Sequence, residues 1–285
     1  MKVMKNILLS DRHRRPIATD IHYSESTGAR PVVIYAHGFN GFKDWGHFDL
    51  IAAEFVKAGF TLVKFNFAFN GTTPDTPEDF TDLAAFRENT YTKELDNLAA
   101  VIDWTTAPDN PYNEFIDANK LGLCGHSMGG GVVIIKAAED ARVKAVATWA
   151  AVAESKTPWG TWPQERIDEW KRESVTYIEN SRTHQQMPLG YQLYKDYQNN
   201  KERLSIESAI RRLTIPILLI HGTEDTSVPI DRARRLKEWQ PAAELYTLST
   251  DHTFGRKHPW LEDTLPQPMQ DALAKTIEFL RKSLA

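Results

Sequence analysis

Apolar residues follow two alternating patterns along the chain. Short blocks rich in Val, Ile and Leu are apolar on both faces, as buried parallel strands require, and longer stretches with helical spacing lie between them. The expected strands are residues 31–37, 60–67, 120–125, 143–151, 215–221 and 243–248. The expected helices are residues 47–58, 91–105, 127–138, 231–239 and 268–284. The alternation predicts an α/β fold with a mostly parallel central sheet and helices on both faces, and residues up to Tyr23 predict an antiparallel pair at its edge.

The alternation is interrupted once, over residues 154–213. This stretch is far longer than an ordinary crossover connection. We therefore expect a core formed by residues 1–153 and 214–285, with residues 154–213 inserted as a helical lid. The inserted aromatic residues are Trp159, Trp162, Trp170, Tyr191, Tyr194 and Tyr197. Packing of the insertion onto the body is the favoured interpretation, and substrate contact is the alternative, with Trp149, Trp159 and Trp162 as its candidates.

Composition narrows the possible partners. The chain is 41% hydrophobic and 25% charged, as in an ordinary globular protein. The formal net charge of -4 gives no basic surface for nucleic acid or anionic lipid. The single cysteine, Cys124, excludes an intrachain disulfide and a cysteine-rich zinc site. Neither a signal-like apolar stretch at the N-terminus nor a run of about 18 apolar residues is present, so we expect a cytoplasmic protein with no membrane partner.

The strongest chemical signal is residues 125–129, Gly-His-Ser-Met-Gly. An expected strand precedes this motif and an expected helix follows it, which is the context of a nucleophile elbow. The serine would lie at the apex of a strained turn, and side chains at the flanking glycines would collide with neighbouring backbone. The alternative, an ordinary serine capping a glycine-rich turn, explains this context less well. Ser127 is therefore the predicted nucleophile.

A second motif, residues 37–41 with the sequence His-Gly-Phe-Asn-Gly, closes an early strand. Acyl transfer turns a carbonyl oxygen into an anion, which two preset backbone N–H groups stabilise. The expected pair is the N–H of Phe39 and that of Met128, directly after the nucleophile. We interpret His37 as a structural imidazole that bonds to the loop backbone.

Two late loops supply the remaining catalytic groups. Asp225 follows the strand over 215–221 and is the favoured acid, with Glu224 as competitor and helix capping as its alternative role. His252 follows the strand over 243–248 and is the expected general base, with His258 as a weaker candidate. The order Ser127, Asp225, His252 along the chain is the one expected for an α/β hydrolase.

These motifs together resemble the α/β-hydrolase superfamily, and within it dienelactone-hydrolase-like proteins and small-acyl or cinnamoyl (feruloyl) esterases. The resemblance implies a carboxylic ester hydrolase that takes a small-molecule ester and needs neither metal nor cofactor. Dienelactone hydrolases proper use a cysteine nucleophile where this chain has Ser127, which favours esterase chemistry over lactone specialisation. A peptidase or thioesterase using the same triad remains the main alternative, ahead of a non-catalytic scaffold or a metal-dependent hydrolase.

Overall fold

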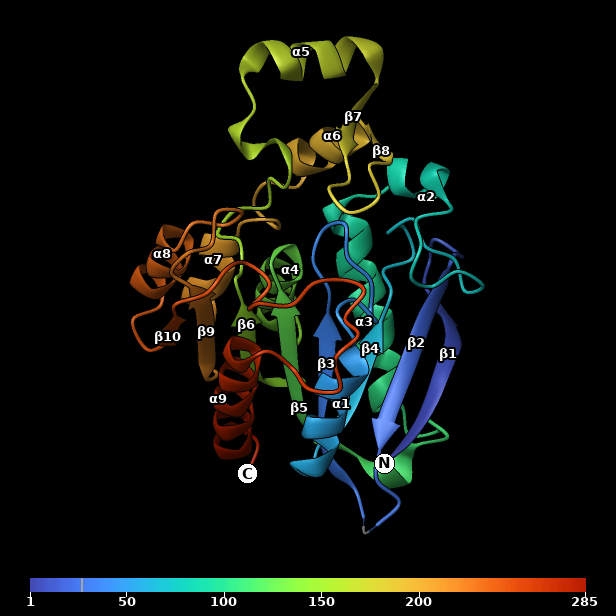
Figure 1. Ribbon diagram of the computed structural model, residues 1–285, viewed down its shortest axis with the longest axis vertical. Helices are drawn as coiled ribbons and strands as arrows, with labels where there is room; N and C mark the ends of the chain where they lie inside the picture. Colours follow the sequence, from blue (N-terminus) through green and yellow to red (C-terminus); the bar gives the residue numbers. More distant parts are fainter. Residues whose placement is uncertain (27) are drawn as a thin grey trace.

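The computed structural model describes residues 1–26 and 28–285. An eight-stranded sheet runs through the molecule in the order β1-β2-β4-β3-β5-β6-β9-β10 (Figure 1). Its strands are β1 (Lys2–Ser10), β2 (Pro16–Tyr23), β3 (Arg30–Ala36), β4 (Thr61–Phe65), β5 (Ile116–His126), β6 (Val143–Trp149), β9 (Ile217–Gly222) and β10 (Glu244–Leu248). Strands β4 to β10 in this order are parallel, whereas β2 is antiparallel to β4 and β1 to β2. The predicted parallel sheet and its antiparallel edge are confirmed.

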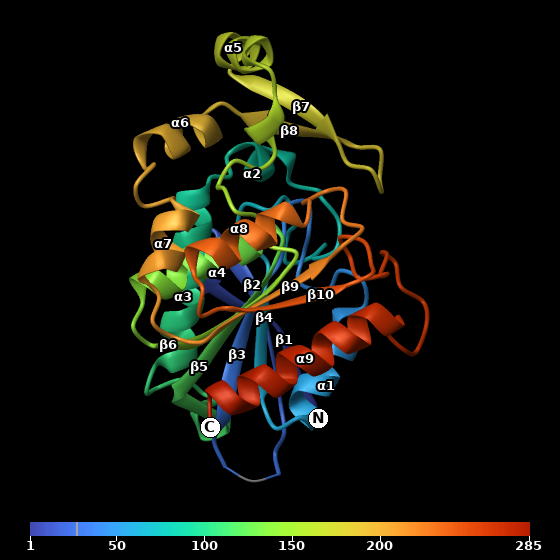
Figure 2. The same ribbon diagram turned by 90° about the vertical axis from the view of Figure 1, so that its left-hand side faces the viewer.

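Helices cover both faces of the sheet (Figure 2). The helices of the body are α1 (Phe48–Lys57), α2 (Leu83–Arg87), α3 (Tyr91–Thr106), α4 (Met128–Glu139), α8 (Asp231–Trp239) and α9 (Gln267–Ser283), with a 3-10 turn at Asn113–Phe115. Helices α1 and α9 pack on one face, and α3, α4 and α8 pack on the other. Within the described residues, no helix combines the length and apolar character that crossing a bilayer requires.

Each face of the sheet has its own apolar core, because the central strands are apolar on both sides. On β3, Val32 and Ile34 face one core and Val33 faces the other, and all three side chains are fully buried. Parallel strands bring their carboxyl ends to one edge of the sheet, so the loops that follow β3, β5, β9 and β10 meet there. This edge holds the candidate functional residues.

The insertion lies beyond that edge, at the top of the molecule in Figure 1. It contains a 3-10 turn at Trp159–Thr161, α5 (Gln164–Glu173), β7 (Val175–Glu179), β8 (Gln186–Gly190), α6 (Gln192–Asn199) and α7 (Ile206–Arg212). The insertion contains the helices expected of it, but the expectation omits a hairpin, in which β7 and β8 pair antiparallel. Helix α7 also packs against α4 and α8 through buried Ile206 and Ile210, so it belongs to the body.

Aromatic packing organises the rest of the insertion. Trp170 is fully buried, and its ring centroid lies 5.5 Å from that of Trp162, 5.5 Å from that of Tyr191 and 6.1 Å from that of Trp159. The Trp170 indole N–H donates to the Leu189 carbonyl at 2.7 Å. These aromatic residues therefore pack mainly with one another inside the insertion, and Trp159 also contacts Tyr91 of the body, with the ring centroids 6.2 Å apart.

Candidate active site

Ser127 lies on the turn between β5 and α4, in a backbone conformation that few residues adopt. Its φ of 55° and ψ of -120° are strained for a side chain with a Cβ. A Cβ at Gly125 would lie 2.4 Å from the Gly129 carbonyl oxygen, and one at Gly129 would lie 2.4 Å from the Ala36 carbonyl oxygen. Both glycines are therefore required, as the motif predicts. The Ser127 N–H donates to the Trp149 carbonyl at 2.8 Å, which ties the turn to the neighbouring strand.

Asp225 and His252 meet although they follow different strands. The His252 Nδ1–H donates to Asp225 Oδ2 at 2.7 Å. The other oxygen, Asp225 Oδ1, accepts the backbone N–H groups of Ser227 at 2.9 Å and Val228 at 2.8 Å. The carboxylate is thus fixed from one side and holds the imidazole from the other, which leaves His252 Nε2 as the nitrogen able to accept a proton.

The surroundings of Asp225 favour its charged form. Burial by itself would raise the pKa of Asp225, but hydrogen bonds from His221 and His252 outweigh burial and hold that pKa well below its ordinary value. His221 Nε2 lies 3.3 Å from Asp225 Oδ2 and donates to the Val228 carbonyl at 2.7 Å. The competitor Glu224 is exposed and accepts a hydrogen bond from the Ser249 hydroxyl, so Asp225 is the residue that meets the histidine.

Ser127 and His252 line one cavity of about 940 Å³ at the edge of the sheet. Within the described residues, their side chains form no hydrogen bond with each other. Such contacts are often long in free hydrolases and tighten when substrate binds. The cavity is large enough for an ester of a small or aromatic acid.

The loop after β3 packs directly against the Ser127 turn. A Cβ at Gly38 would lie 3.0 Å from the Ser127 Cβ, so glycine is needed for this close approach. The Gly38 carbonyl accepts the Gly41 N–H at 3.1 Å and the His37 Nδ1–H at 2.9 Å. In a trans peptide the next N–H, that of Phe39, points the opposite way from this carbonyl. Met128 begins α4, so its N–H has no partner in the helix ladder.

The two other candidate histidines have structural roles. His37 is buried, and its Nε2 accepts the Phe67 N–H at 3.3 Å. Burial lowers the pKa of His37 to about 4, which keeps the ring neutral, as its predicted structural role requires. His258 packs edge-on against Phe42, and its Nδ1 accepts the Gly46 N–H at 3.2 Å. Asp225 meets His252, so His258 is not the base held by the acid.

Two of the three tryptophans proposed as substrate contacts are enclosed in cores. Trp149 is fully buried, and its indole N–H donates to the Thr276 hydroxyl at 2.9 Å. Trp159 is only 4% exposed and packs against Trp170. The prediction of substrate contact is therefore wrong for Trp149 and Trp159. Trp162 is partly exposed but stacks under the Arg166 guanidinium, 3.7 Å from its ring centroid, and does not line the cavity of Ser127.

His126, the variable position of the serine motif, was not predicted to have a role. Its Nε2–H donates to the backbone carbonyl of His252 at 2.9 Å, and the two ring centroids are 4.7 Å apart. Burial, followed by the nearby His252, lowers the pKa of His126 well below its ordinary value, so the ring is neutral. His126 therefore holds the loop that carries His252. A Gly-x-Ser-x-Gly pattern leaves this position free and gives no signal for such a role.

The cysteine three positions before Ser127 cannot substitute for it. Cys124 is fully buried in β5, and burial raises the pKa of its thiol far above the ordinary range. We expect the native protein to be inert to a thiol reagent such as dithionitrobenzoate, whereas one thiol per chain reacts after unfolding in guanidinium chloride. Rapid labelling of the native protein would contradict this burial.

Family comparison covers the first part of the chain, which includes Ser127 but neither Asp225 nor His252. A model described as the dienelactone hydrolase family matches residues 19–171, which confirms the resemblance inferred from the motifs. An uncharacterised 31.7 kDa protein of the traX-finO intergenic region of Escherichia coli is 29% identical over 138 residues, which are 48% of this chain and 43% of that protein. The matched region spans less than half the length of the curated relatives.

Solved structures with the same fold are similar over nearly the whole chain. Est1E from Butyrivibrio proteoclasticus, with ferulic acid bound, has a TM-score of 0.68 at 17% identity and covers 98% of both chains. A putative hydrolase from Agrobacterium vitis S4 has a TM-score of 0.70 at 17% identity and covers 100% of both chains. These similarities confirm the predicted α/β-hydrolase fold.

Proposed function

The chain belongs to the dienelactone hydrolase family, and from this premise we propose that it hydrolyses carboxylic esters of small or aromatic acids through an acyl-enzyme on Ser127. The observation that carries the proposal is the 2.7 Å hydrogen bond from His252 to Asp225. His252 lines the same cavity as Ser127, which lies on a strained turn. The three residue types in this arrangement are those of an acyl-transfer triad.

In the proposed first half-reaction the Ser127 Oγ attacks the ester carbonyl carbon. His252 Nε2 takes the hydroxyl proton as the O–C bond forms, and Asp225 stabilises the resulting imidazolium. The backbone N–H groups of Phe39 and Met128 hold the developing oxyanion. Collapse of the tetrahedral intermediate breaks the bond to the alcohol oxygen, and that oxygen receives the proton from His252.

In the second half-reaction a water molecule attacks the acyl-enzyme. His252 Nε2 takes one proton from this water, and the oxyanion forms again between the same two N–H groups. Collapse then breaks the bond between the acyl carbon and Ser127 Oγ, and His252 returns the proton to the serine. The products are a carboxylic acid and free enzyme, and no cofactor enters the balance.

A panel of substrates tests the proposal. We expect p-nitrophenyl esters of short aliphatic and hydroxycinnamic acids to be hydrolysed with a higher kcat/KM than aminoacyl anilides or acyl thioesters. The competing functions, a serine peptidase or a thioesterase, would use the same groups because acyl transfer differs mainly in its leaving group. A higher kcat/KM for an anilide or a thioester would therefore replace the ester assignment with that one.

Labelling separates an enzyme from a non-catalytic scaffold. A fluorophosphonate reacts with a serine that a neighbouring base activates. We expect one label per chain, located at Ser127 by peptide mass spectrometry. Absence of the label, together with absence of turnover over the whole panel, would refute the proposed function.

A further inference from the structure

The loop that carries Phe39, residues 37–41, lies beside the segment that follows β4. Strands β3 and β4 are parallel neighbours in the sheet, so the segments that follow their carboxyl ends meet at the same edge. The segment after β4, residues 66–72, carries three buried polar side chains. They are Asn66, Asn70 and Thr72, which are 3%, 5% and 8% exposed. Buried polar groups are almost always hydrogen-bonded, and the partners of these three show what they hold in place.

The side-chain amide of Asn70 reaches both ends of the loop. Its Nδ2 donates to the Gly41 carbonyl at 3.2 Å and lies 3.4 Å from His37 Nε2. An amide NH2 group has two hydrogens, so one side chain serves both acceptors. On the other side, Asn70 Oδ1 accepts the backbone N–H of Thr72 at 3.1 Å and the Thr72 hydroxyl at 2.9 Å. These two donors fix the amide with its NH2 group toward the loop.

Asn66 extends the same network to the residue next but one after the loop. Its Nδ2–H donates to Thr72 Oγ1 at 2.9 Å, and its Oδ1 accepts the Lys43 N–H at 2.6 Å. The Thr72 hydroxyl thus accepts from Asn66 and donates to Asn70. The segment after β4 therefore holds the segment after β3 at the His37 ring, at the Gly41 carbonyl and at the Lys43 N–H.

The His37 ring transmits this restraint to the peptide that joins Gly38 and Phe39. Its Nε2 accepts from the Phe67 N–H at 3.3 Å and faces the Asn70 amide. A neutral imidazole has one proton, which must then be on Nδ1, and Nδ1 donates to the Gly38 carbonyl at 2.9 Å. The Gly38 carbonyl and the Phe39 N–H belong to one planar peptide and point in opposite directions. A bond that fixes the carbonyl therefore fixes the direction of the N–H.

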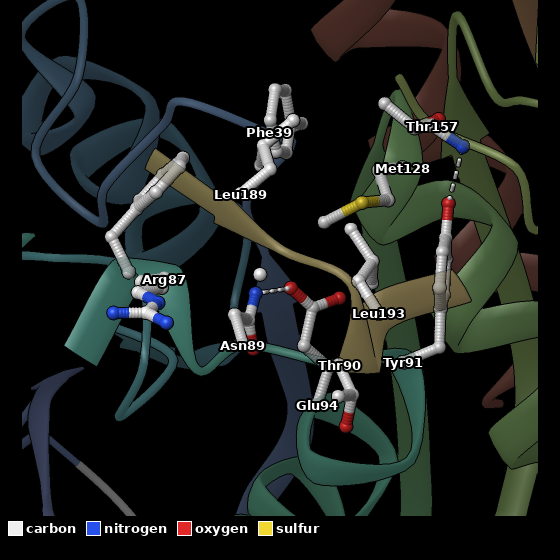
Figure 3. Close-up of a pocket in the computed structure, with 12 residues that line it drawn as sticks. Phe39, Arg87, Asn89, Thr90, Tyr91, Glu94, Met128, Thr157, Leu189 and Leu193 are labelled. Atoms are coloured by element: carbon white, nitrogen blue, oxygen red, sulfur yellow. Dashed lines mark hydrogen bonds between the residues drawn. The ribbon is translucent and has the colours of Figure 1, made fainter. Parts of the chain in front are cut away.

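The side chain of Phe39 is held separately, by packing. It lines a small cavity that Met128 also lines (Figure 3), and its ring centroid lies 5.7 Å from that of Phe86. Packing of the ring keeps the residue in place, but it does not determine how the preceding peptide is rotated. The hydrogen bonds to the loop determine that rotation.

We propose that Asn70 is a positioning residue for the oxyanion hole. Through His37 and Gly41 it keeps the Gly38–Phe39 peptide turned so that the Phe39 N–H can bind the oxyanion. This inference rests on the proposed ester hydrolysis, in which that N–H stabilises the tetrahedral intermediate. Asn70 does not line the cavity of Ser127, so it acts through the loop and not on the substrate.

The Asn70→Ala variant tests this role through the difference between ground state and transition state. We expect kcat for p-nitrophenyl butanoate to fall about 10-fold to 100-fold, somewhat less than the loss of a whole oxyanion donor, because the N–H is displaced and not removed. The KM should stay within about threefold, because the oxyanion exists only after attack. A change in overall stability alone would not produce this division between kcat and KM.

A pair of inhibitors measures the oxyanion hole directly. An alkyl trifluoromethyl ketone accepts the Ser127 oxygen at its carbonyl carbon and so forms a tetrahedral oxyanion, whereas the alcohol made by reducing the same ketone forms none. In Asn70→Ala the inhibition constant of the ketone should rise by about the factor lost in kcat, and that of the alcohol should stay within about threefold. The ratio of the two constants therefore reports the oxyanion hole.

Asn110 provides a matched control. It is also 5% exposed, its Nδ2 donates to the Trp104 carbonyl at 2.6 Å and its Oδ1 accepts the Tyr112 N–H at 2.8 Å. Asn110 precedes β5 and Ser127 follows it, so the two residues lie at opposite edges of the sheet. Asn110→Ala should lose stability as Asn70→Ala does, but its kcat and its ratio of inhibition constants should stay within about twofold of the wild type.

Thr72→Val keeps the shape of a second member of the network and removes the hydroxyl that orients the Asn70 amide. Its kcat should fall about threefold, the effect of one net hydrogen bond. If Asn70→Ala does not fold, as judged by circular dichroism, Thr72→Val decides alone. Wild-type kcat and a wild-type ratio of inhibition constants in the folded variants would overturn the proposed role of Asn70, as would an equal loss of kcat in Asn110→Ala. Failure of the wild type to hydrolyse any ester would instead refute the proposed function.

Discussion

Ser127→Ala is expected to lower kcat for a p-nitrophenyl ester by about 10⁵-fold, because no acyl-enzyme can form without the hydroxyl oxygen. The remaining rate would come from the binding cavity and the two backbone N–H groups. Alanine fits the same turn, so the circular dichroism spectrum and the Tm should stay close to those of the wild type. Initial rates at saturating ester measure the effect, with the active sites of the wild type titrated by a fluorophosphonate and the variant quantified by absorbance.

A serine outside the cavity provides the control for Ser127. Ser249 is exposed, and its hydroxyl donates to the exposed Glu224. Ser249→Ala should keep turnover within about twofold of the wild type, as surface substitutions generally do. Substantial ester turnover by Ser127→Ala would contradict the assignment of Ser127 as the nucleophile.

Asp225→Asn should lower kcat/KM by about 10³-fold to 10⁴-fold while leaving the size of the side chain unchanged. The backbone N–H groups of Ser227 and Val228 would hold the amide oxygen, so the amide NH2 would face His252 Nδ1. The imidazole would then carry its proton on Nε2 and could not accept one from the serine. The kcat/KM from steady-state kinetics and the rate of fluorophosphonate labelling should both fall.

Glu224→Gln is the matched control for this substitution, because it makes the same chemical change at the adjacent position. Glu224 is exposed and bonds to Ser249, so the kcat/KM of this variant should stay within about twofold of the wild type. An equal loss of kcat/KM in Asp225→Asn and Glu224→Gln would mean that negative charge in the loop after β9, and not the orientation of His252, determines the rate.

The parallel sheet and the catalytic loops could be predicted because their signals are local. Strands such as β3 and β9 are continuous apolar runs, and the serine motif combines a strand, a turn and a helix in a few residues. The β7–β8 hairpin escaped prediction because β7 alternates only weakly in burial and Pro188 interrupts the pattern of β8. Short strands that pair only with each other carry little apolar signal.

The burial of Glu94 can be predicted from the sequence. It lies three positions after Tyr91 and four before Leu98, and both of these side chains are buried, so helical spacing places Glu94 on the buried face of α3. A fully buried charged residue is uncommon in folded proteins. The contact between His126 and the His252 carbonyl spans 126 positions, and no local pattern could reveal it.

The burial of Cys124 makes this protein suited to spectroscopic labelling. The sequence has a single cysteine, and that thiol is fully enclosed in β5. A cysteine introduced at an exposed site on the hairpin, for example by Tyr177→Cys at a position that is 54% exposed, would therefore be the one reactive thiol in the folded chain. A spin label or fluorophore there would report directly on movement of the hairpin during turnover, with no background from the body.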